Sequence, residues 1–342
     1  MKQQTLQTPW MVVRHLFVFM LGCGPALMVQ AQVEIDEWQV PYEKSRPRDP
    51  FAAQADEVWF VGQRTGYLAR FDLTTESFEL VELKEGSGPH NLIVGSDGIV
   101  WFAGNRTALI GRYDPDSGDL KEIAMPDAAV KDPHTLVFDA DESHIWFTAQ
   151  RSNRIGRLTI ATQKVDLIPV PSADARPYGI KVGPGGDIWV DLFGTNKLAH
   201  VDPQSLELTE IVLPRANSRP RRLEITSDGR VWYGDYTGGH LGVYDPSSES
   251  IQEWMLPQGE TAAPYGMASD SEDRIWLVAT GVYPNEFVGF DTRTETFTAA
   301  TPIPSGAGTV RHMHYHPESQ AVWFGTDSNY LGRAMLPTAS GD

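Results

Sequence analysis

The sequence predicts an all-β protein, a seven-bladed β-propeller, and three observations support this fold class. Tryptophan recurs at nearly constant spacing, each copy lies in a short run of β-branched and aromatic residues, and glycine-containing turns separate the runs. The seven copies stand 42 to 47 residues apart and are Trp59, Trp101, Trp146, Trp189, Trp232, Trp276 and Trp323. Repeats of about 40–45 residues with four short strands each are the signature of propeller blades.

The elements of each repeat follow in the same order. A turn such as residues 96–98, Ser-Asp-Gly, precedes the tryptophan strand, and such a turn suits a β-hairpin. A second strand comes next, for example residues 110–114, and then a more polar strand that ends at a proline, for example residues 120–126. We expect the tryptophans to form the cores of the blades.

The two ends of the chain predict how the ring closes. Residues 34–41 have the pattern of an outer strand, yet they precede the first complete repeat. The last repeat ends after Arg333, one strand short of the others. We therefore expect the N-terminal strand to complete the seventh blade and to remove the open sheet edge that an incomplete blade would leave.

Composition and charge narrow the function classes. The chain has 342 residues, 41% of them hydrophobic and 21% charged, and a formal net charge of −17. Such acidity argues against nucleic-acid binding, which needs Lys and Arg to neutralise phosphates, and against an anionic membrane surface. We expect residues 32–342 to form a single domain that is not membrane-embedded and is monomeric.

Residues 1–31 have the pattern of an export signal peptide. Lys2 and Arg14 make the start basic, an apolar stretch follows, and residues 29–31, Val-Gln-Ala, offer small side chains for cleavage. We expect an exported protein, periplasmic or secreted. The weaker alternative is a lipoprotein anchored at Cys23, the only cysteine, whose removal would leave no disulfide and no thiolate ligand.

Polar and aromatic residues occur where the inner strand of each blade should begin. Counting back eleven residues from each tryptophan, or twelve in the third repeat, gives Arg48, His90, His134, Tyr178, Arg221, Tyr265 and His312. Six of the seven follow a proline, which fixes the backbone there. Because inner strands line the central channel of a propeller, these side chains should surround one channel mouth.

An acid joins this ring two residues before one of the histidines. Among the seven positions that precede the ring by two residues, only Asp132 is acidic. Two imidazoles and one carboxylate, from His90, His134 and Asp132, suit a divalent metal or a general base with its partner. The alternative is that these histidines fill a wet channel and have no chemical role.

Two short repeats carry a family resemblance. Residues 175–180, Ala-Arg-Pro-Tyr-Gly-Ile, and residues 263–267, Ala-Pro-Tyr-Gly-Met, are followed by Trp strands and by Ile-Gly-Arg-like strands. This pattern, over residues 34–337, resembles the streptogramin B lyases, typified by virginiamycin B lyase. That family carries a Pro-His and a Glu-Pro-His motif in adjacent blades. Pro89–His90 matches the first motif, and Asp132–Pro133–His134 matches the second with Asp in place of Glu.

The resemblance implies a reaction and a cofactor. The implied substrate is a small molecule, a cyclic depsipeptide or a related ester or lactone. The family opens a cyclic depsipeptide by elimination: a base removes a proton α to a carbonyl and the ester oxygen leaves. His134 is the candidate base, and His90 and Asp132 are candidates for orienting that base or for metal contact. Together with His134 they form the ligand set that the resemblance implies for Mg²⁺.

The other ring residues are candidate substrate-binding residues. Arg48 and Arg221 are expected to bind a carboxylate or to polarise a carbonyl group. Tyr178 and Tyr265 are expected to stack on an aromatic group of the substrate, although packing of their own loops is the alternative. His312 is the ring position of the last blade.

A second histidine group and two further functions complete the hypotheses. His312, His314 and His316 alternate, which puts them on one face of a strand, as a metal site or as hydrogen-bonded structural side chains. The main alternative to a lyase is a non-enzymatic periplasmic propeller that binds a ligand or a protein. A calcium-dependent lactonase would need a cluster of Glu and Asn or Asp in the channel, and the ring lacks it.

Overall fold

The computed structural model describes residues 32–337 of the chain. The predicted signal peptide, with the lipoprotein alternative at Cys23, lies outside the described residues. Within residues 32–337 no helix is long and apolar enough to cross a membrane.

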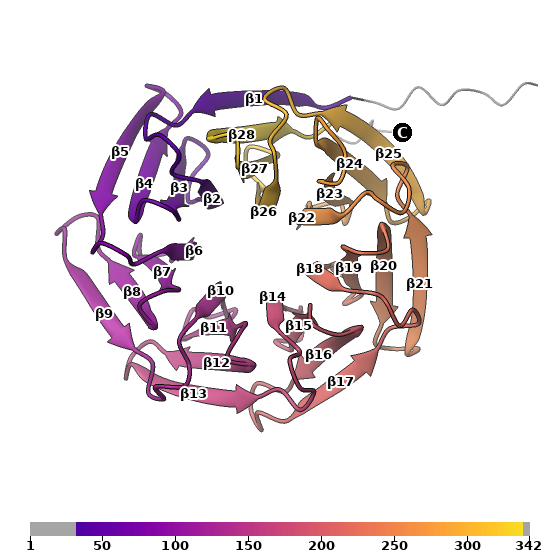
Figure 1. Ribbon diagram of the computed structural model, residues 1–342, viewed down its shortest axis with the longest axis horizontal. Coiled ribbons are helices and arrows are strands. Elements are labelled where there is room, and N and C mark those ends of the chain that lie inside the picture. The colour runs from indigo at the N-terminus through magenta and orange to yellow at the C-terminus, as the bar shows by residue number, and fades with distance from the viewer. Residues whose placement is uncertain (1–31, 338–342) are drawn as a thin grey trace, which may run out of the picture. The chain divides into compact units, whose positions relative to one another are not determined.

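The described residues form seven four-stranded antiparallel sheets around a central channel, as the tryptophan repeat predicts (Figure 1). The innermost strands are β2 (Pro47–Ala52), β6 (Pro89–Val94), β10 (Pro133–Phe138), β14 (Pro177–Val182), β18 (Pro220–Ile225), β22 (Pro264–Ser269) and β26 (Val310–His316). The second strands are β3 (Glu57–Gly62), β7 (Val100–Gly104), β11 (His144–Ala149), β15 (Ile188–Leu192), β19 (Val231–Asp235), β23 (Ile275–Ala279) and β27 (Ala321–Thr326).

The remaining strands form the outer half of each blade. The third strands are β4 (Tyr67–Asp72), β8 (Leu109–Tyr113), β12 (Arg154–Thr159), β16 (Lys197–Val201), β20 (His240–Asp245), β24 (Glu286–Asp291) and β28 (Tyr330–Met335). The outermost strands are β5 (Ser77–Glu82), β9 (Leu120–Ala124), β13 (Lys164–Pro169), β17 (Leu208–Val212), β21 (Ser250–Met255), β25 (Thr296–Pro302) and β1 (Glu34–Gln39).

The N-terminal strand closes the ring, which confirms the sequence prediction. β1 pairs antiparallel with β28, from Glu34 opposite Met335 to Gln39 opposite Tyr330. Trp38 of β1 stacks on Trp323 of β27, with 5.6 Å between the ring centroids. The seventh blade is therefore built from both ends of the described chain (Figure 1).

The tryptophan strands form the blade cores, and glycine on the neighbouring strand makes room for them. All seven repeating tryptophans are buried, with at most 5% of each side chain exposed. The ring of Phe102 lies against Gly111, and that of Phe147 against Gly156, so closely that a Cβ on either glycine would stand about 2 Å from ring atoms. The recurring glycine of the third strand is thus explained by close approach of an aromatic ring rather than by backbone conformation.

Each inner strand contains a bulge just after it begins. In β6, Pro89 lies opposite Gly104, whereas Leu92 lies opposite Phe102, so β6 has one residue more than β7 over this stretch. The same register shift occurs in the inner strands of the other six blades. A bulge breaks the alternation of side chains along a strand, so two consecutive residues can turn toward the channel.

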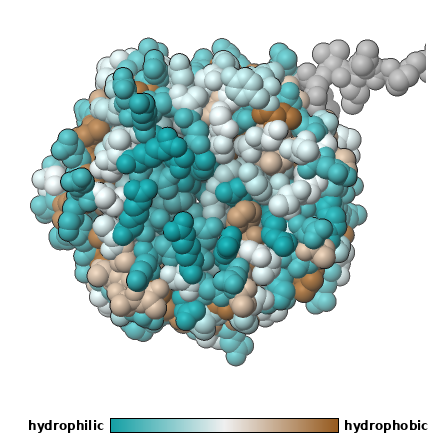
Figure 2. Space-filling view, in the orientation of Figure 1, coloured by the Kyte–Doolittle hydropathy of each residue, from teal (hydrophilic) through white to brown (hydrophobic). Residues whose placement is uncertain are grey.

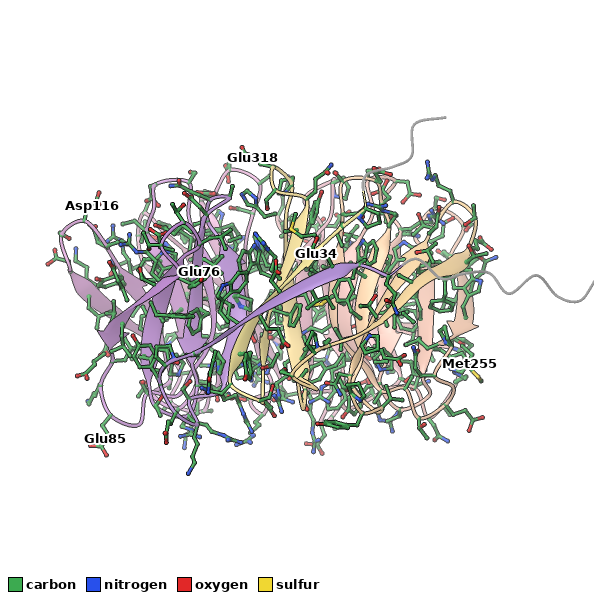
Figure 3. The ribbon with its side chains drawn as sticks, turned by 90° about the horizontal axis from the view of Figure 1, so that it is seen from above. Glu34, Glu76, Glu85, Asp116, Met255 and Glu318 are labelled. Carbon is green, nitrogen blue, oxygen red and sulfur yellow. The ribbon has the colours of Figure 1, made fainter. Side chains whose placement is uncertain are left out.

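The ring has two faces, and the inner strands all begin at one of them, here called the mouth face. The loops between second and third strands and the loops between blades lie on the mouth face, because the strands are antiparallel. Figure 3 shows Glu85, from a loop between blades, on one face and Asp116 and Glu318, from the other turns, on the opposite face.

We expect loss of β1 to destabilise the whole ring. Deleting residues 32–39 leaves β28 with an unpaired edge and removes the Trp38–Trp323 contact, so the melting temperature should fall and aggregation should increase. Trp38→Ala alone should lower the free energy of unfolding by about 3 kcal/mol, the lower end of the range for a buried aromatic.

A matched control separates closure from loss of a tryptophan. Trp254 stacks on Trp232 at the same centroid distance, 5.6 Å, in a blade made of consecutive strands. The deletion should lower the melting temperature more than Trp254→Ala does. An unchanged melting temperature after the deletion would contradict closure by β1.

Candidate functional site

Two histidines from adjacent blades meet at the channel mouth. The imidazoles of His90 on β6 and His134 on β10 have ring centroids 3.6 Å apart, and 5% and 2% of these residues are exposed. The Nδ1 atom of His134 shares a hydrogen bond of 2.9 Å with the Thr135 hydroxyl. The sequence thus predicted correctly that the two histidines lie together, and Thr135 fixes the orientation of one of them.

Both imidazoles are held in the neutral form. Burial lowers the pKa of His90 well below its ordinary value, and the Arg48 guanidinium lowers it further. Burial likewise lowers the pKa of His134, with Arg222 and Arg48 as the next largest causes. A neutral imidazole has a free lone pair at neutral pH, so either ring can accept a proton.

Two tyrosines and an arginine continue the ring. Tyr178 lies beside His134, with ring centroids 4.1 Å apart, and its hydroxyl is hydrogen-bonded to that of Tyr265. The guanidinium carbon of Arg221 lies 3.7 Å from the centroid of the Tyr265 ring and also close to Tyr178. Burial raises the pKa of Tyr178, but the charges of Arg221, Arg222 and Arg48 outweigh it and lower that pKa to about 8.

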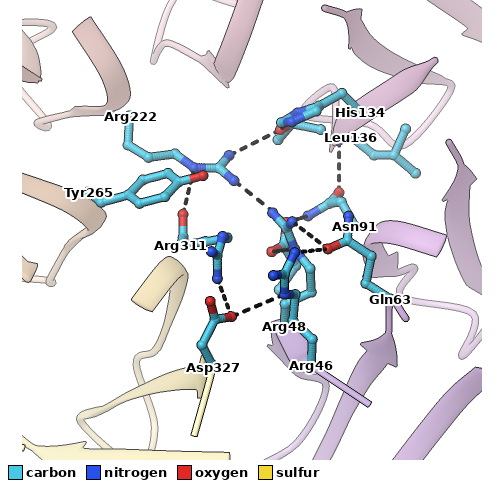
Figure 4. Close-up of polar contacts among 12 residues, drawn as sticks. Arg46, Arg48, Gln63, Asn91, His134, Leu136, Arg222, Tyr265, Arg311 and Asp327 are labelled. Atoms are coloured by element: carbon cyan, nitrogen blue, oxygen red, sulfur yellow. Dashed lines mark hydrogen bonds and ion pairs between the residues drawn. The ribbon is translucent and has the colours of Figure 1, made fainter. Parts of the chain in front are cut away.

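A buried ion-pair network connects these side chains beneath the mouth. Asp49 accepts a hydrogen bond of 2.8 Å from Arg48 Nε and one of 3.1 Å from Asn91 Nδ2. Arg222 reaches across the channel, with Nη2 3.6 Å from Asp49 Oδ2 and Nη1 donating to the Thr135 hydroxyl at 3.0 Å (Figure 4). Three blades thus share the Asp49 carboxylate.

The sequence did not point to this network, although its signal was present. Asp49, Asn91, Thr135 and Arg222 each come directly after a ring position. Strict alternation would turn them away from the channel, and the bulge in each inner strand turns them toward their neighbours instead. Polar residues at consecutive positions in an otherwise apolar strand were the available clue.

Asp132 holds a loop and does not contact the imidazoles. Its Oδ2 accepts a hydrogen bond of 2.5 Å from the backbone N–H of Arg151, and its Oδ1 accepts bonds from the hydroxyl and the N–H of Ser152. The side chain therefore fixes the loop that follows β11. Both carboxyl oxygens thus bond to the loop, and no hydrogen bond joins Asp132 to His134 in the described structure.

The three residues expected to hold Mg²⁺ do not fit such a site. No group of three or more His, Cys, Asp or Glu side chains within residues 32–337 is arranged to hold a metal ion. The imidazoles of His90 and His134 stack, Asp132 faces its own loop, and the nearest charges are the guanidiniums of Arg48 and Arg222. Mg²⁺ also prefers oxygen ligands. The magnesium cofactor stays a prediction from the resemblance.

The last blade contributes one histidine to the channel ring, and two further histidines of the same strand make hydrogen bonds within the protein. Burial lowers the pKa of His312 well below its ordinary value, and the opposing charges of Arg222 and Asp49 also act on it. His314 stacks on Phe51 at 4.1 Å, and its Nδ1 accepts a hydrogen bond from the Ala52 N–H. His316 shares a hydrogen bond of 3.0 Å with Ser319. Of the two alternatives expected for this histidine group, a metal site or hydrogen-bonded structural side chains, His314 and His316 show the hydrogen bonds of the second.

One buried acid has no hydrogen-bond partner in the described structure. Asp191, at the end of β15, is fully buried, and neither carboxyl oxygen is hydrogen-bonded. Burial raises its pKa well above the ordinary value, against the attraction of Arg222. Burial thus favours the protonated form of Asp191.

Comparison with known proteins now places the chain. The sequence profile of the virginiamycin B lyase family matches residues 25–283, which is most of the chain. The chain belongs to this family. The matched range contains His90, His134, Tyr178, Arg221 and Tyr265 and leaves out His312. A comparison with curated protein sequences gives no significant match.

Solved structures show the same architecture within and beyond the virginiamycin B lyase family. Selenomethionine-substituted virginiamycin B lyase from Staphylococcus aureus is 21% identical, with a TM-score of 0.81, over 90% of this chain and 100% of that one. A catalytically inactive His-to-Ala variant of that enzyme with quinupristin is 21% identical, with a TM-score of 0.80, over 90% of this chain and 100% of that one. Hydrazine synthase from Kuenenia stuttgartiensis is 14% identical, with a TM-score of 0.70, over 88% of this chain and 98% of that one. At such identities these likenesses show the fold alone.

The buried histidines predict how stability depends on pH. In the unfolded chain a histidine has a pKa of about 6.5, and in the folded protein burial and the guanidiniums lower the pKa of His90 and His134. Below pH 6.5 the unfolded state therefore binds more protons, so the stability present at neutral pH is lost as the pH falls. Each such histidine should remove up to about 1.4 kcal/mol per pH unit.

Urea denaturation between pH 7 and pH 5 measures this effect. His134→Gln should reduce the pH slope of the unfolding free energy by up to about 1.4 kcal/mol per pH unit. His200→Gln removes a partly buried imidazole on β16, away from the channel, and is the matched control: the slope should change less in this variant than in His134→Gln. Equal slopes for wild type and His134→Gln would show that His134 is not held neutral.

Proposed function

We propose that the protein is a lyase that opens a cyclic depsipeptide, or a related ester or lactone, by elimination at the channel mouth. Membership of the virginiamycin B lyase family supports the reaction class. The observation that carries the proposal is a buried pair of imidazoles whose partner Thr135 also accepts a hydrogen bond from the Arg222 guanidinium. An elimination of this kind needs both a base and a positive group for the charge that develops.

His134 is the proposed base. Its Nδ1 is held by Thr135, and its ring lies between His90 and Tyr178, so its orientation is fixed on several sides. In the proposed step the imidazole lone pair takes the proton from the carbon next to the substrate carbonyl. The electrons of that C–H bond form a carbon–carbon double bond, and the C–O bond breaks with its pair on the departing carboxylate. His134 later gives its proton to solvent or product.

The guanidiniums are proposed to stabilise the enolate that forms during this step. Nη2 of Arg48 is buried and makes no hydrogen bond in the described structure, and Nη2 of Arg222 makes only the ion pair of 3.6 Å with Asp49. Donors left open beside a base can bind a carbonyl oxygen more strongly as it becomes negative. Arg48 is fixed by Asp49, and Arg222 by Thr135 and the Arg311 carbonyl, so neither needs to move far.

Replacement of the base should abolish turnover. We expect His134→Ala to lower kcat by about 10²–10⁴-fold, the usual contribution of a general base, and to keep the fold. His144→Ala is the matched control, because His144 pairs with Asp139 away from the channel and should not affect activity. Product formation on candidate cyclic depsipeptides and lactones, followed by mass spectrometry, measures the effect.

The same assay in ¹⁸O-labelled water separates elimination from hydrolysis. Elimination leaves the ring-opened product unlabelled, whereas hydrolysis adds one labelled oxygen. Labelled product would overturn the lyase assignment. Ligand binding with no turnover on any of these substrates would favour a propeller that only binds its ligand.

Metal removal tests the magnesium prediction separately. The resemblance predicts that kcat falls in excess EDTA and recovers when Mg²⁺ is added. An unchanged kcat in EDTA would agree instead with the poor fit of the described residues to a Mg²⁺ site.

A further inference from the structure

A basic cavity lies on the mouth face, beside the channel and separate from the histidine pair. It has a volume of about 860 Å³, within the range of small-molecule sites, and is formed by loops of the first three blades. The charged residues that line it are Arg46, Arg64, Arg106, Lys131, Asp132 and Arg151. Figure 2 shows strongly hydrophilic residues gathered beside the central opening, over the strands drawn in purple in Figure 1.

The positive charge of this cavity is not neutralised by the protein. Five cationic side chains face one acid, and that acid, Asp132, already accepts hydrogen bonds from its own loop. Arg46 pairs with Asp327 at 3.2 Å. No carboxylate within residues 32–337 forms an ion pair with the other four cationic side chains, Arg64, Arg106, Lys131 and Arg151. In a protein of net charge −17 such a concentration of unpaired cations is a local exception.

A glycine leaves space for one of these cationic side chains, and hydrogen bonds fix the backbone that carries two others. The side chain of Arg106 lies over Gly88, where a Cβ would come within 2.7–3.0 Å of it, so the missing side chain leaves its space to Arg106. Asp132 and Ser152 fix the loop that carries Arg151, and the Ser152 hydroxyl also accepts a hydrogen bond from the Lys131 N–H. The cavity wall is therefore built by hydrogen bonds as well as by exposed charges.

The cavity is linked to the channel by one shared side chain. Gln63 lines the cavity, and its Oε1 accepts hydrogen bonds from Arg46 at 3.4 Å and from Arg48 at 3.2 Å (Figure 4). Arg48 belongs to the channel ring. Gln63 therefore connects a side chain of the cavity wall with a side chain of the channel ring.

We propose that this cavity binds the carboxylate groups of a multiply anionic small molecule, and that this molecule is the substrate whose reacting end enters the channel. The second part rests on the proposed function. Arginine suits carboxylates because its planar fork can donate two parallel hydrogen bonds to the two oxygens. Several arginines around one hollow select a ligand with several such groups over a neutral cyclic peptide.

Binding of propane-1,2,3-tricarboxylate tests the proposal without knowledge of the substrate. Isothermal titration calorimetry on the purified protein, at low ionic strength, should show binding of the tricarboxylate and none of its neutral triamide. The affinity should fall as salt is added, because exposed charges are screened. The double variant Arg64→Gln/Arg106→Gln should weaken binding by about tenfold or more, as expected when charged hydrogen bonds are lost.

Control variants and a second anion make the outcomes distinct. Arg293→Gln, on the opposite face in the turn after β24, also removes an exposed arginine and should leave binding unchanged. Arg106→Lys should keep part of the affinity that Arg106→Gln loses. Absence of tricarboxylate binding, or equal affinity in the double variant, would overturn the proposal. Tighter binding of inorganic phosphate than of tricarboxylate would overturn the assignment to carboxylates.

Failure of the proposed function is distinguishable from failure of this site. His134→Ala should bind tricarboxylate like the wild type, since His134 does not line the cavity. Tricarboxylate binding without lyase activity on any anionic ester would leave the cavity assigned and refute the reaction. Lyase activity on neutral substrates that the double variant retains unchanged would refute the role of the cavity in substrate binding.

Discussion

The Asp49 carboxylate holds the centre of the ring together. It accepts hydrogen bonds from Arg48 and Asn91 and pairs with Arg222, so side chains from three blades depend on one buried anion. Removal of one partner from a buried ion pair typically costs about 3–5 kcal/mol, because the remaining charge is left in a medium of low polarity. Without Asp49 the two guanidiniums would face each other unbalanced, and the positions of the histidines above them would be lost.

The same charges set the protonation of the site. Burial and the guanidinium charges lower the pKa of His90, His134 and His312. At Tyr178 burial raises the pKa, but the guanidinium charges outweigh burial and lower it. The mouth therefore combines histidines whose neutral form is favoured with arginines whose positive charge is fixed in place. A positive charge there favours a nearby oxyanion and disfavours protonation of the imidazoles. The proposed elimination would use an unprotonated base and a positive group near the carbonyl oxygen.

Much of the fold could be predicted from the sequence because a propeller repeats itself. The tryptophan spacing gave the number of blades, and the polar strand before the first repeat gave the closure that β1 makes with β28. Counting back from the tryptophans located His90 and His134, which the structure brings together.

The partners of these residues were harder to predict. Spacing places a residue along a strand, but it does not say that a bulge turns Asn91 or Thr135 inward, or that Asp132 bonds to the loop of Ser152. Charge pairing across the channel joins residues from distant blades, such as Asp49 and Arg222. No local pattern in one repeat contains that information.

Closure by β1 also sets the order in which the molecule can be assembled. Six blades consist of consecutive strands, so each can form as soon as its own residues are available. The seventh joins Gln39 to Tyr330, and contacts between residues so far apart in sequence form slowly because a long loop must close first. The ring therefore remains open during synthesis until its last strand emerges, and the polypeptide must keep its first strand unpaired for almost the entire time.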